Sequence, residues 1–220
     1  MEKIAISLTF GLTVLLMLSG CHFGVHGSGN RITETRELGP FTAVETSGAF
    51  EVQVTCQKPP SLEIEGDDNI LPLIQTEVRN GVLRVSSTKA YSSREGISLR
   101  ITVPDLERIQ TSGAGKIRVT DLKNDKFEIH SSGAALVTAA GQTRSLDIST
   151  SGAGKIDTHN LRSETADVSV SGAAVVDVSA SDELDVSVTG AGRVTYSGNP
   201  KVSKHVSGAG QVIKKEETGV

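Results

Sequence analysis

Four acidic residues recur at nearly equal steps in the second half of the chain, at Glu128, Asp147, Asp167 and Asp185. Successive members are separated by about 19 residues, a short period of the kind found in repeat proteins. If the chain stacks them one above another, neighbouring carboxylates lie ~5 Å apart and repel one another modestly in water. A bound cation or nearby lysines would relieve that repulsion. The spacing leaves two interpretations: a surface ladder that binds Ca²⁺ or a cationic partner, and an ordinary solvated acidic face.

The residues around these carboxylates do not complete a catalytic or metal-binding pattern. The next outward position gives Gln110, His130, Ser149, Ser169, Ser187 and His205. Two histidines separated by hydroxyl residues do not match the ligand spacing of a metal cluster. Gly115 and Lys116 are followed by Ile117, which breaks the pattern of a phosphate-binding loop. We therefore predict no catalytic residue, no metal site and no cofactor.

A short tripeptide, Ser-Gly-Ala or Thr-Gly-Ala, occurs with its glycine at Gly48, Gly113, Gly133, Gly152, Gly172, Gly190 and Gly208. From Gly113 onward these glycines recur at nearly constant spacing. A short, fixed period of this kind predicts a chain that coils and stacks on itself. Glycine suits the corner of each coil because it reaches backbone angles that other residues avoid.

Segments before and after each glycine alternate between apolar and polar residues, which is typical of strands with one buried face. Leu146-Asp147-Ile148-Ser149 is one example. Stacked coils pair in parallel at ~4.8 Å per rung, and parallel crossovers are right-handed by default. We therefore predict an all-β, single-domain right-handed parallel β-helix, a solenoid with about 18–20 residues per coil.

Two further columns follow the corners in this prediction. We expect an inward column made of Ile117, Leu136, Ile156, Val175, Val194 and Val212. On the surface we expect Lys116, Lys155 and Arg193 to alternate with Ala135 and Ala174. The three basic residues are candidates to relieve the repulsion between the stacked carboxylates.

The first residues have the features of a secretory signal. Glu2 and Lys3 precede an almost uncharged apolar run over residues 4–18, shorter than the ~20 residues of a membrane-spanning helix. The ending Leu18-Ser19-Gly20-Cys21 resembles the lipobox of bacterial lipoproteins. That resemblance implies cleavage before Cys21 and attachment of a diacylglyceryl group to it. An ordinary secretory signal with a chance cysteine is the alternative.

These features divide the chain into four segments. We predict a lipoprotein signal peptide over residues 1–20, a lipidated Cys21 with a flexible tether over 21–35, a β-helix domain over 36–215 and a tail over 216–220. His22, rather than Asp, follows the cysteine, which favours the outer membrane under the usual Gram-negative sorting tendency. We expect a lipid-anchored protein of the bacterial cell envelope, on either the periplasmic or the surface face, whose anchor makes the membrane a partner.

Composition argues against some classes of partner. Lysine and arginine number 22 against 26 aspartates and glutamates, and this net charge of −4 gives no electrostatic case for nucleic acid. The chain has no tryptophan, two tyrosines and five phenylalanines, so it offers few aromatic platforms for a sugar-binding cleft. Cys56 lies in an alternating segment, where we expect it to be a plain small side chain.

Three features together carry a family resemblance: the coil over 41–54, the segment Asp68-Asn69-Ile70-Leu71-Pro72, and the Ser-Gly-Ala-Gly repeats. With the lipobox, they make the chain resemble a lipoprotein member of the bacterial GIN-domain family, described as auto-transporter adhesin head domains. The resemblance covers roughly residues 36–215. It implies a right-handed parallel β-helix in an envelope-facing protein, and it brings no catalytic residues to assign.

Three functions compete at this point. The first is a non-catalytic envelope protein that presents a solenoid surface for adhesion to an unknown protein or glycan. The second is a polysaccharide-active enzyme, because β-helix folds host such enzymes, although fold analogy alone is weak support. The third is a periplasmic sensor or regulatory partner. The scarcity of aromatic residues and the absence of long insertions over 105–213 favour the first.

Overall fold

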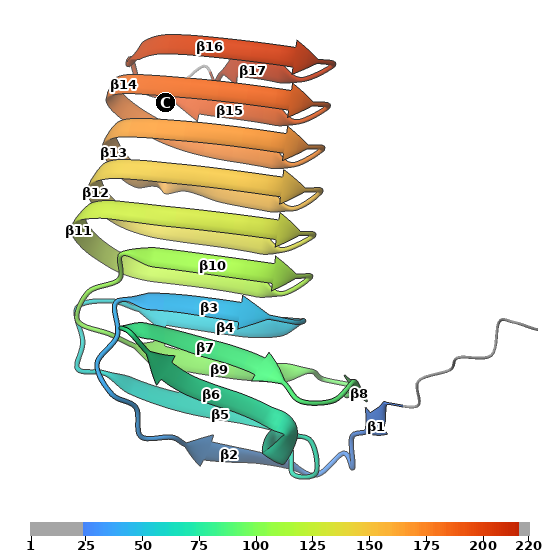
Figure 1. Cartoon of the computed structure of the whole chain (residues 1–220). Coiled ribbons are helices and arrows are strands. Elements are labelled where there is room, and N and C mark those ends of the chain that lie inside the picture. The colour runs from blue at the N-terminus through green and yellow to red at the C-terminus, as the bar shows by residue number, and fades with distance from the viewer. Residues whose placement is uncertain (1–23, 216–220) are drawn as a thin grey trace, which may run out of the picture.

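The computed structural model describes residues 24–215 and folds them into a right-handed parallel β-solenoid of about five turns (Figure 1). Strands make up 71% of the structure, and the only helix among the described residues is a short 3₁₀ helix, η1. The predicted all-β solenoid is therefore confirmed. No helix within residues 24–215 combines the length and the hydrophobicity that crossing a bilayer requires. The predicted signal peptide, Cys21 and the tail over 216–220 lie outside the described residues.

The chain divides into an irregular first part and regular coils. The first part contains β1 (Val25–His26), β2 (Arg31–Thr35), β3 (Ala43–Ser47), β4 (Phe50–Thr55), β5 (Ser61–Asp67), η1 (Leu71–Leu73), β6 (Ile74–Arg79), β7 (Val82–Ser87), β8 (Tyr91–Ser92) and β9 (Ile97–Thr102). The coils contain β10 (Arg108–Gly113), β11 (Lys116–Gly133), β12 (Leu136–Gly152), β13 (Lys155–Gly172), β14 (Val175–Gly190), β15 (Arg193–Ser197), β16 (Lys201–Gly208) and β17 (Gln211–Lys214). Each long strand from β11 to β14 starts after one corner, bends around the opposite edge and ends at the next corner (Figure 1). Each coil therefore contributes to both faces of the solenoid.

The coils pair in parallel with their corners in register. Gly133 pairs with Gly113 on one side, and on the other side it pairs with the corner glycine that ends β12. Ile129, Ile148 and Val168 occupy one inward column and are fully buried. Because each rung repeats the last, the core is a set of apolar columns that run along the solenoid axis.

The inward column after the corners differs from the prediction at two places. Leu136 and Val175 point outward, with 38% and 37% exposure, and the inward places belong to Val137 and Val176. In each of these two pairs of adjacent apolar residues, the prediction placed the wrong residue in the core. The predicted inward positions of Ile117, Ile156, Val194 and Val212 are confirmed, with Val212 partly buried.

The same one-residue error affects the basic residues beside this column. The outward column contains Lys116, Leu136, Lys155, Val175 and Arg193. The alanines predicted to alternate with the basic residues, Ala135 and Ala174, are buried. Counting residues from each corner glycine gives the observed arrangement, because the same number of residues separates every corner glycine from the start of the strand that follows it.

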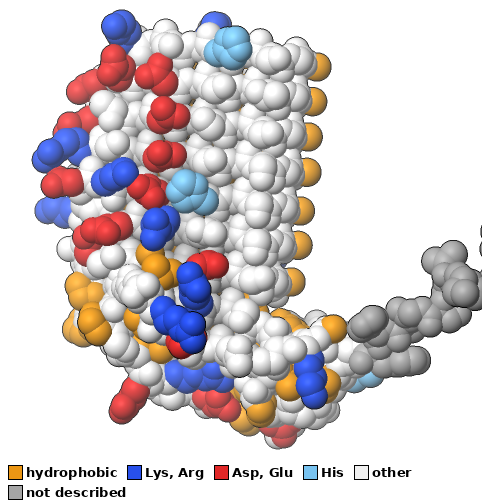
Figure 2. All heavy atoms as spheres, viewed as in Figure 1, with side chains coloured by type: hydrophobic (Ala, Val, Ile, Leu, Met, Phe, Trp, Pro, Cys, Tyr) orange, Lys and Arg blue, Asp and Glu red, His pale blue; other side chains and the backbone are white. Residues whose placement is uncertain are grey.

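The Ser-Gly-Ala corner is explained by the close approach of successive coils. At Gly133 the backbone φ is +128°, and a Cβ atom there would collide with the carbonyl oxygen of Gly113. That same oxygen accepts a hydrogen bond from the backbone N–H of Ala134 at 2.9 Å. The alanine itself is exposed, and Figure 2 shows a row of hydrophobic side chains along the edge where the corners stack. The motif is therefore structural.

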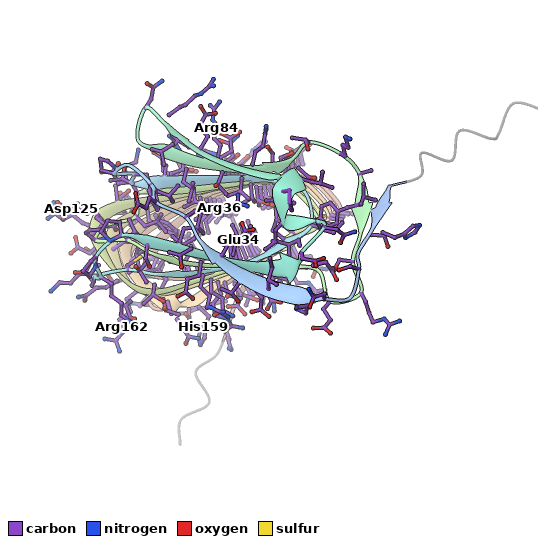
Figure 3. All side chains as sticks on the ribbon, turned by 90° about the horizontal axis from the view of Figure 1, so that it is seen from below. Glu34, Arg36, Arg84, Asp125, His159 and Arg162 are labelled. Carbon is purple, nitrogen blue, oxygen red and sulfur yellow. The ribbon has the colours of Figure 1, made fainter. Side chains whose placement is uncertain are left out.

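The N-terminal end of the solenoid is closed by a cap. In it β2 pairs with β5, β5 with β9 and β6 with β7, all antiparallel, while η1 buries Leu71 completely. Arg36 lies across the end of the solenoid (Figure 3), where it donates to the carbonyl oxygens of Ile74 at 2.7 Å and Leu71 at 3.1 Å. Its guanidinium also pairs with Glu34 at 3.1 Å. These contacts satisfy backbone groups that would otherwise end without partners.

The cap also corrects the predicted flexible tether over residues 21–35. β2 covers Arg31–Thr35 and is part of the sheet, and β1 pairs with β8. From Val25 onward the predicted tether is therefore held against the folded domain. Its partner strands begin at Ser61 and Tyr91, so no local sequence pattern indicates the pairing.

The C-terminal end has a different character. In the last coil, β16 places Lys204 in the inward column that contains Val186 below it, and β17 places Lys214 above Tyr196. Val206, also at an inward position, is 40% exposed. Among residues 24–215 no segment covers this coil as the cap covers the first one. Charged side chains therefore occupy core positions where the stack ends.

Cys56 lies within the core as a free thiol that is 1% exposed. Burial raises the pKa of this thiol to about 12, with smaller contributions from Asp105 and Asp121. A thiol with such a pKa has almost no thiolate at neutral pH and is a poor nucleophile. Cys56 therefore fills space, as the sequence indicates.

Candidate functional site

The acidic ladder is the outward column formed by Glu128, Asp147, Asp167 and Asp185. Each of these residues pairs directly with the next on adjacent coils, so their side chains leave the same face at one-rung spacing. The column starts beside Arg108 and ends beside Ser203. Figure 2 shows a row of acidic side chains running along this face.

The negative charge of Glu128, the first member of the ladder, is balanced by neighbouring basic side chains. The Glu128 carboxylate accepts a hydrogen bond from the Lys126 ammonium and lies 3.8 Å from Arg108 and 3.5 Å from His130. The bond from Lys126 lowers the pKa of Glu128, with a smaller effect from Arg108. Glu128 is therefore a structural ion-pair partner more than a free ligand.

The other three members have no ion pair among the described residues. Burial raises the pKa of Asp167, and the neighbouring charges of Asp147 and Asp185 raise it further. The ionised form of Asp167 is therefore disfavoured by its place in the ladder. These three aspartates leave a strip of uncompensated negative charge on an otherwise regular face.

The predicted source of relief lies elsewhere in the molecule. Lys116, Lys155 and Arg193 follow the corners, whereas the acidic ladder precedes them, so the two columns lie on opposite faces (Figure 1). Lys155 instead pairs with Asp157 at 3.6 Å and Asp177 at 3.5 Å on its own face. The prediction that these basic residues relieve the ladder is therefore wrong.

The column next to the ladder contains Gln110, His130, Ser149, Ser169, Ser187 and His205, in the expected order. Within residues 24–215 no group of three or more histidine, cysteine, aspartate or glutamate side chains is arranged to hold a metal ion. The stacked aspartates each contribute one carboxylate per rung. This arrangement differs from a convergent ligand set, in which several oxygens point to one centre.

A shallow groove on the opposite face was not indicated by the motifs. Its volume is about 410 Å³, and Asp157, His159, Asn160, Asp177 and Tyr196 line it. The strand pairing shifts between Thr158 and Arg162, so residues 159–160 bulge beside the shorter coil that follows. The step from Gly172 to Gly190, which is shorter than the one before it, is the signal that could have located this groove. Because both aspartates contact Lys155, they form an ion-paired cluster rather than a separate acid and base.

Comparisons with known proteins agree with this architecture. A crystal structure of a "putative adhesin" from Bacteroides fragilis has a TM-score of 0.70 at 23% sequence identity, covering 87% of this chain and 100% of that one. A "putative adhesin" from Parabacteroides merdae has a TM-score of 0.57 at 19% identity, covering 87% and 99%. A "putative lipid binding protein" from Parabacteroides distasonis has a TM-score of 0.58 at 19% identity, also covering 87% and 99%. At these identities the likeness shows the fold alone.

The family itself is shown by a sequence model. No curated protein matches this chain. Residues 40–200 match the family model described as "Putative auto-transporter adhesin, head GIN domain". Since that match spans well over half of the sequence, the chain belongs to the GIN-domain family.

Proposed function

We propose that this chain is a non-catalytic, lipid-anchored protein of the cell envelope, in the outer membrane, that presents its solenoid surface for adhesion to a protein or glycan. The observation that carries the proposal is the regular register of the coils, which turns single residues into long outward columns. Family members described as adhesins support a role in adhesion and a place in the cell envelope or on the cell surface. The ion-paired carboxylates of the groove favour a binding role over catalysis.

Within this proposal the acidic ladder is the contact face, and it suits a cationic partner. Asp147, Asp167 and Asp185 carry charges without ion pairs among the described residues, so a basic surface placed against them gains attraction without displacing existing pairs. Attraction between exposed charges of this kind steers association and weakens as salt is added.

Display of the full chain on a heterologous bacterium tests this role. We expect displaying cells to adhere to surfaces coated with a basic protein more than cells without the chain do. Replacing the three aspartates with asparagine should reduce that adherence, whereas Lys116→Gln with Arg193→Gln, on the opposite face, should not. Equal adherence of all strains to basic-protein, neutral-glycan and acidic-glycan surfaces would contradict the proposal. Depolymerisation of any of these glycans by the purified chain would favour the enzyme instead.

The lipid anchor needs a separate test, because Cys21 lies outside the described residues. Metabolic labelling with a tagged fatty acid should mark the chain and place it in the membrane fraction. Cys21→Ala should abolish both the label and the membrane association. Cys56→Ala is the matched control: it removes the buried thiol and should leave labelling intact. Labelling that survives Cys21→Ala would contradict anchoring at this residue.

A further inference from the structure

The folded domain begins very close to the proposed anchor. β1 pairs in parallel with β8, and the backbone N–H of Val25 donates to the carbonyl oxygen of Ala90 at 2.9 Å. Gly27 donates in the same way to Ser92 at 2.8 Å. Val25 is only four residues beyond Cys21 in the sequence. The corner where β1 meets β8 is therefore the part of the domain nearest to Cys21 along the chain.

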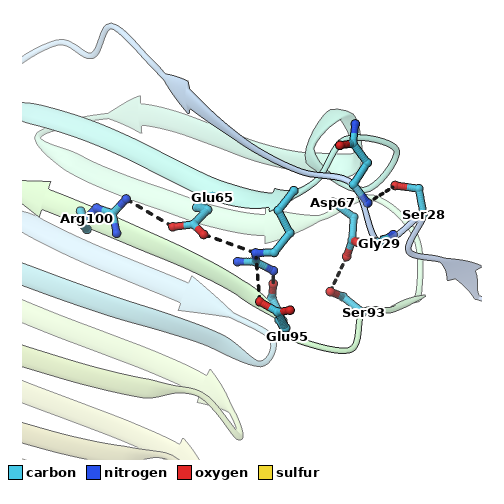
Figure 4. A network of polar contacts seen from close by, with 10 residues as sticks. Ser28, Gly29, Glu65, Asp67, Ser93, Glu95 and Arg100 are labelled. Carbon is cyan, nitrogen blue, oxygen red and sulfur yellow. Dashed lines mark hydrogen bonds and ion pairs between the residues drawn. The ribbon is translucent and has the colours of Figure 1, made fainter.

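A polar network fixes the residues that follow β1 (Figure 4). Asp67 accepts hydrogen bonds from the backbone N–H of Gly29, at 2.8 Å, and from the Ser93 hydroxyl. The hydrogen bond from Ser93 has the largest effect on the pKa of Asp67 and lowers it, and the hydrogen bond from Gly29 lowers this pKa further. Asn69 donates to the carbonyl oxygen of His26 at 2.7 Å and accepts from the backbone N–H of Ser28 at 2.9 Å. The chain after β1 is therefore clamped to the cap.

Chain length then limits how far the corner can move from a membrane. Four residue steps span at most ~14 Å when fully extended, and each polar layer of a bilayer is ~5–7 Å thick. If Cys21 carries lipid at the surface of the hydrocarbon, the β1–β8 corner stays within roughly two such layers of it. The far end of the solenoid has no comparable restriction.

The chemistry of the corner suits an anionic lipid surface. A groove of about 610 Å³ lies there, lined in part by Ala49, Phe50, Lys89, Ala90 and Tyr91. Half-buried tyrosines are favoured at membrane interfaces, where the ring is apolar and the hydroxyl is hydrated. Burial raises the pKa of the Tyr91 hydroxyl, which keeps it neutral.

Charge supports the same occupant. Lys89 and Arg94 are exposed and form no ion pair within the described part of the chain. Among the acidic side chains nearby, Glu95 pairs with Arg31 at 3.4 Å. Asp67 and Asp68 are held in place by hydrogen bonds from Gly29, Ser93, Ser28 and Asn30, and both remain ionised. Basic residues at a membrane surface are attracted to anionic headgroups. Lys89 therefore lines the apolar groove, and Arg94 lines a second pocket of the same corner, beside Gly27 and Gly29.

We infer that the β1–β8 corner, with Lys89, Arg94 and Tyr91, docks on the anionic phospholipid surface that holds the anchor, so that the solenoid projects away from the membrane. This inference rests on the proposed lipid anchor at Cys21. It adds an orientation: the acidic ladder and the C-terminal coils extend away from the bilayer, towards a partner.

The test uses the full, lipidated chain in vesicles of phosphatidylglycerol and phosphatidylethanolamine. Ala90→Cys at the corner and Ala209→Cys on the last coil are matched exposed alanines for a fluorescent label, and buried Cys56 should not react. A headgroup quencher in the vesicles should quench the label at residue 90 severalfold more than the label at residue 209. Equal quenching at both positions in protein that floats with the vesicles would overturn the docking. Protein that does not float with vesicles would instead contradict the anchor.

A charge variant tests the surface itself. With the label at residue 90, Lys89→Gln and Arg94→Gln should each lower the ratio of docked to undocked protein about fivefold, as expected for one basic residue near an anionic surface. Lys116→Gln is the control and should leave quenching unchanged. If both variants at the corner quench like the parent chain, the tether alone sets the distance and the proposed docking surface is wrong.

Discussion

The two ends of the solenoid solve the same problem in different ways. At the N-terminal end, antiparallel strands and η1 cover the first coil, and Arg36 bonds to backbone carbonyls across it. At the C-terminal end the last coil is exposed, and lysines occupy inward columns at Lys204 and Lys214. A stacked sheet exposes unpaired backbone groups wherever it stops, and those groups can pair with another chain. One end is closed by packing, and the other is protected by charge.

This difference indicates that the cap mainly determines stability, whereas the last coil mainly determines solubility. The cap buries apolar side chains such as Leu71 completely, so its residues contribute to the free energy of unfolding. The last coil buries little, so its lysines mainly affect which molecules can stack on it. Mutations at the two ends should therefore change different measurements.

The largest effect is expected within the regular coils that join the two ends. Gly133→Val should lower the free energy of unfolding by about 4 kcal/mol, because positive φ and contact with the Gly113 backbone both disfavour a side chain. Gly39→Ala, where the backbone has open space and φ is not positive, should be nearly neutral. Urea denaturation of both variants measures the difference. A Gly133→Val variant as stable as the parent would mean that the corners can separate.

The next prediction compares the two ends directly. Leu71→Ala in the cap should cost about 3 kcal/mol, since it truncates a fully buried side chain and leaves a cavity in the core. Val206→Ala, at the 40% exposed position of the last coil, should cost less than about 0.5 kcal/mol. Thermal unfolding of the two variants checks the contrast. Equal losses would show that the last coil is covered as well as the first.

Removing the inward lysines should change association instead of stability. Replacing Lys204 and Lys214 with valine gives the last coil an uninterrupted apolar end, which we expect to stack on another copy. Sedimentation over a range of concentrations should show heavier species in the double variant than in the parent. Lys116→Val, on an outward column of a middle coil, is the control for added apolar surface. Identical sedimentation of the double variant and the parent would contradict protection by charge.

The smallest effects belong to the acidic ladder and have opposite signs at two of its members. The raised pKa of Asp167 means that its ionised form disfavours folding, so Asp167→Asn should stabilise by ~0.3 kcal/mol at neutral pH. The lowered pKa of Glu128 means that its ionised form favours folding, so Glu128→Gln should destabilise by about 0.5 kcal/mol.

The pH dependence of these two effects follows from the same shifts. The penalty from Asp167 is complete above its raised pKa and disappears as the pH falls below the ordinary carboxyl pKa. The gain from Glu128 is complete above its ordinary pKa and is lost as the pH falls through its lowered pKa. Denaturation at neutral and acidic pH should show both differences shrinking in acid. Two variants that shift in the same direction would contradict the assigned charges.

The periodic part of the molecule was predictable, because its structure depends on local spacing. The corner glycines alone indicate the coils, and the order from Glu128 to Asp185 gives the acidic ladder. Two outward side chains were misassigned, since Leu136-Val137 and Val175-Val176 are apolar pairs in which alternation selects neither member.

The irregular part was not predictable from such patterns. The docking of β1 and β2 depends on partners that lie far along the chain, as in the pairing of Arg31 with Asp67. Glycine-rich composition over residues 24–30 is typical of a tether, yet the side chains of Asp67 and Asn69 bind its backbone. The groove near Asp157 likewise depends on one coil being shorter than its neighbour. The spacing of the corner glycines shows this difference, whereas the alternation of apolar and polar residues does not.

Because the corners are in register, the length of the solenoid can change by whole coils. Deleting residues 134–152, which form one full coil from corner to corner, would join Gly133 to Ala153 and keep every interior column continuous. Such a deletion would shorten the solenoid by one rung, ~4.8 Å, and place Glu128 directly beside Asp167. Duplication of the same segment would lengthen it equally. The distance from the cap to the last coil can therefore change by gain or loss of coils, while the faces of the protein keep the same chemistry.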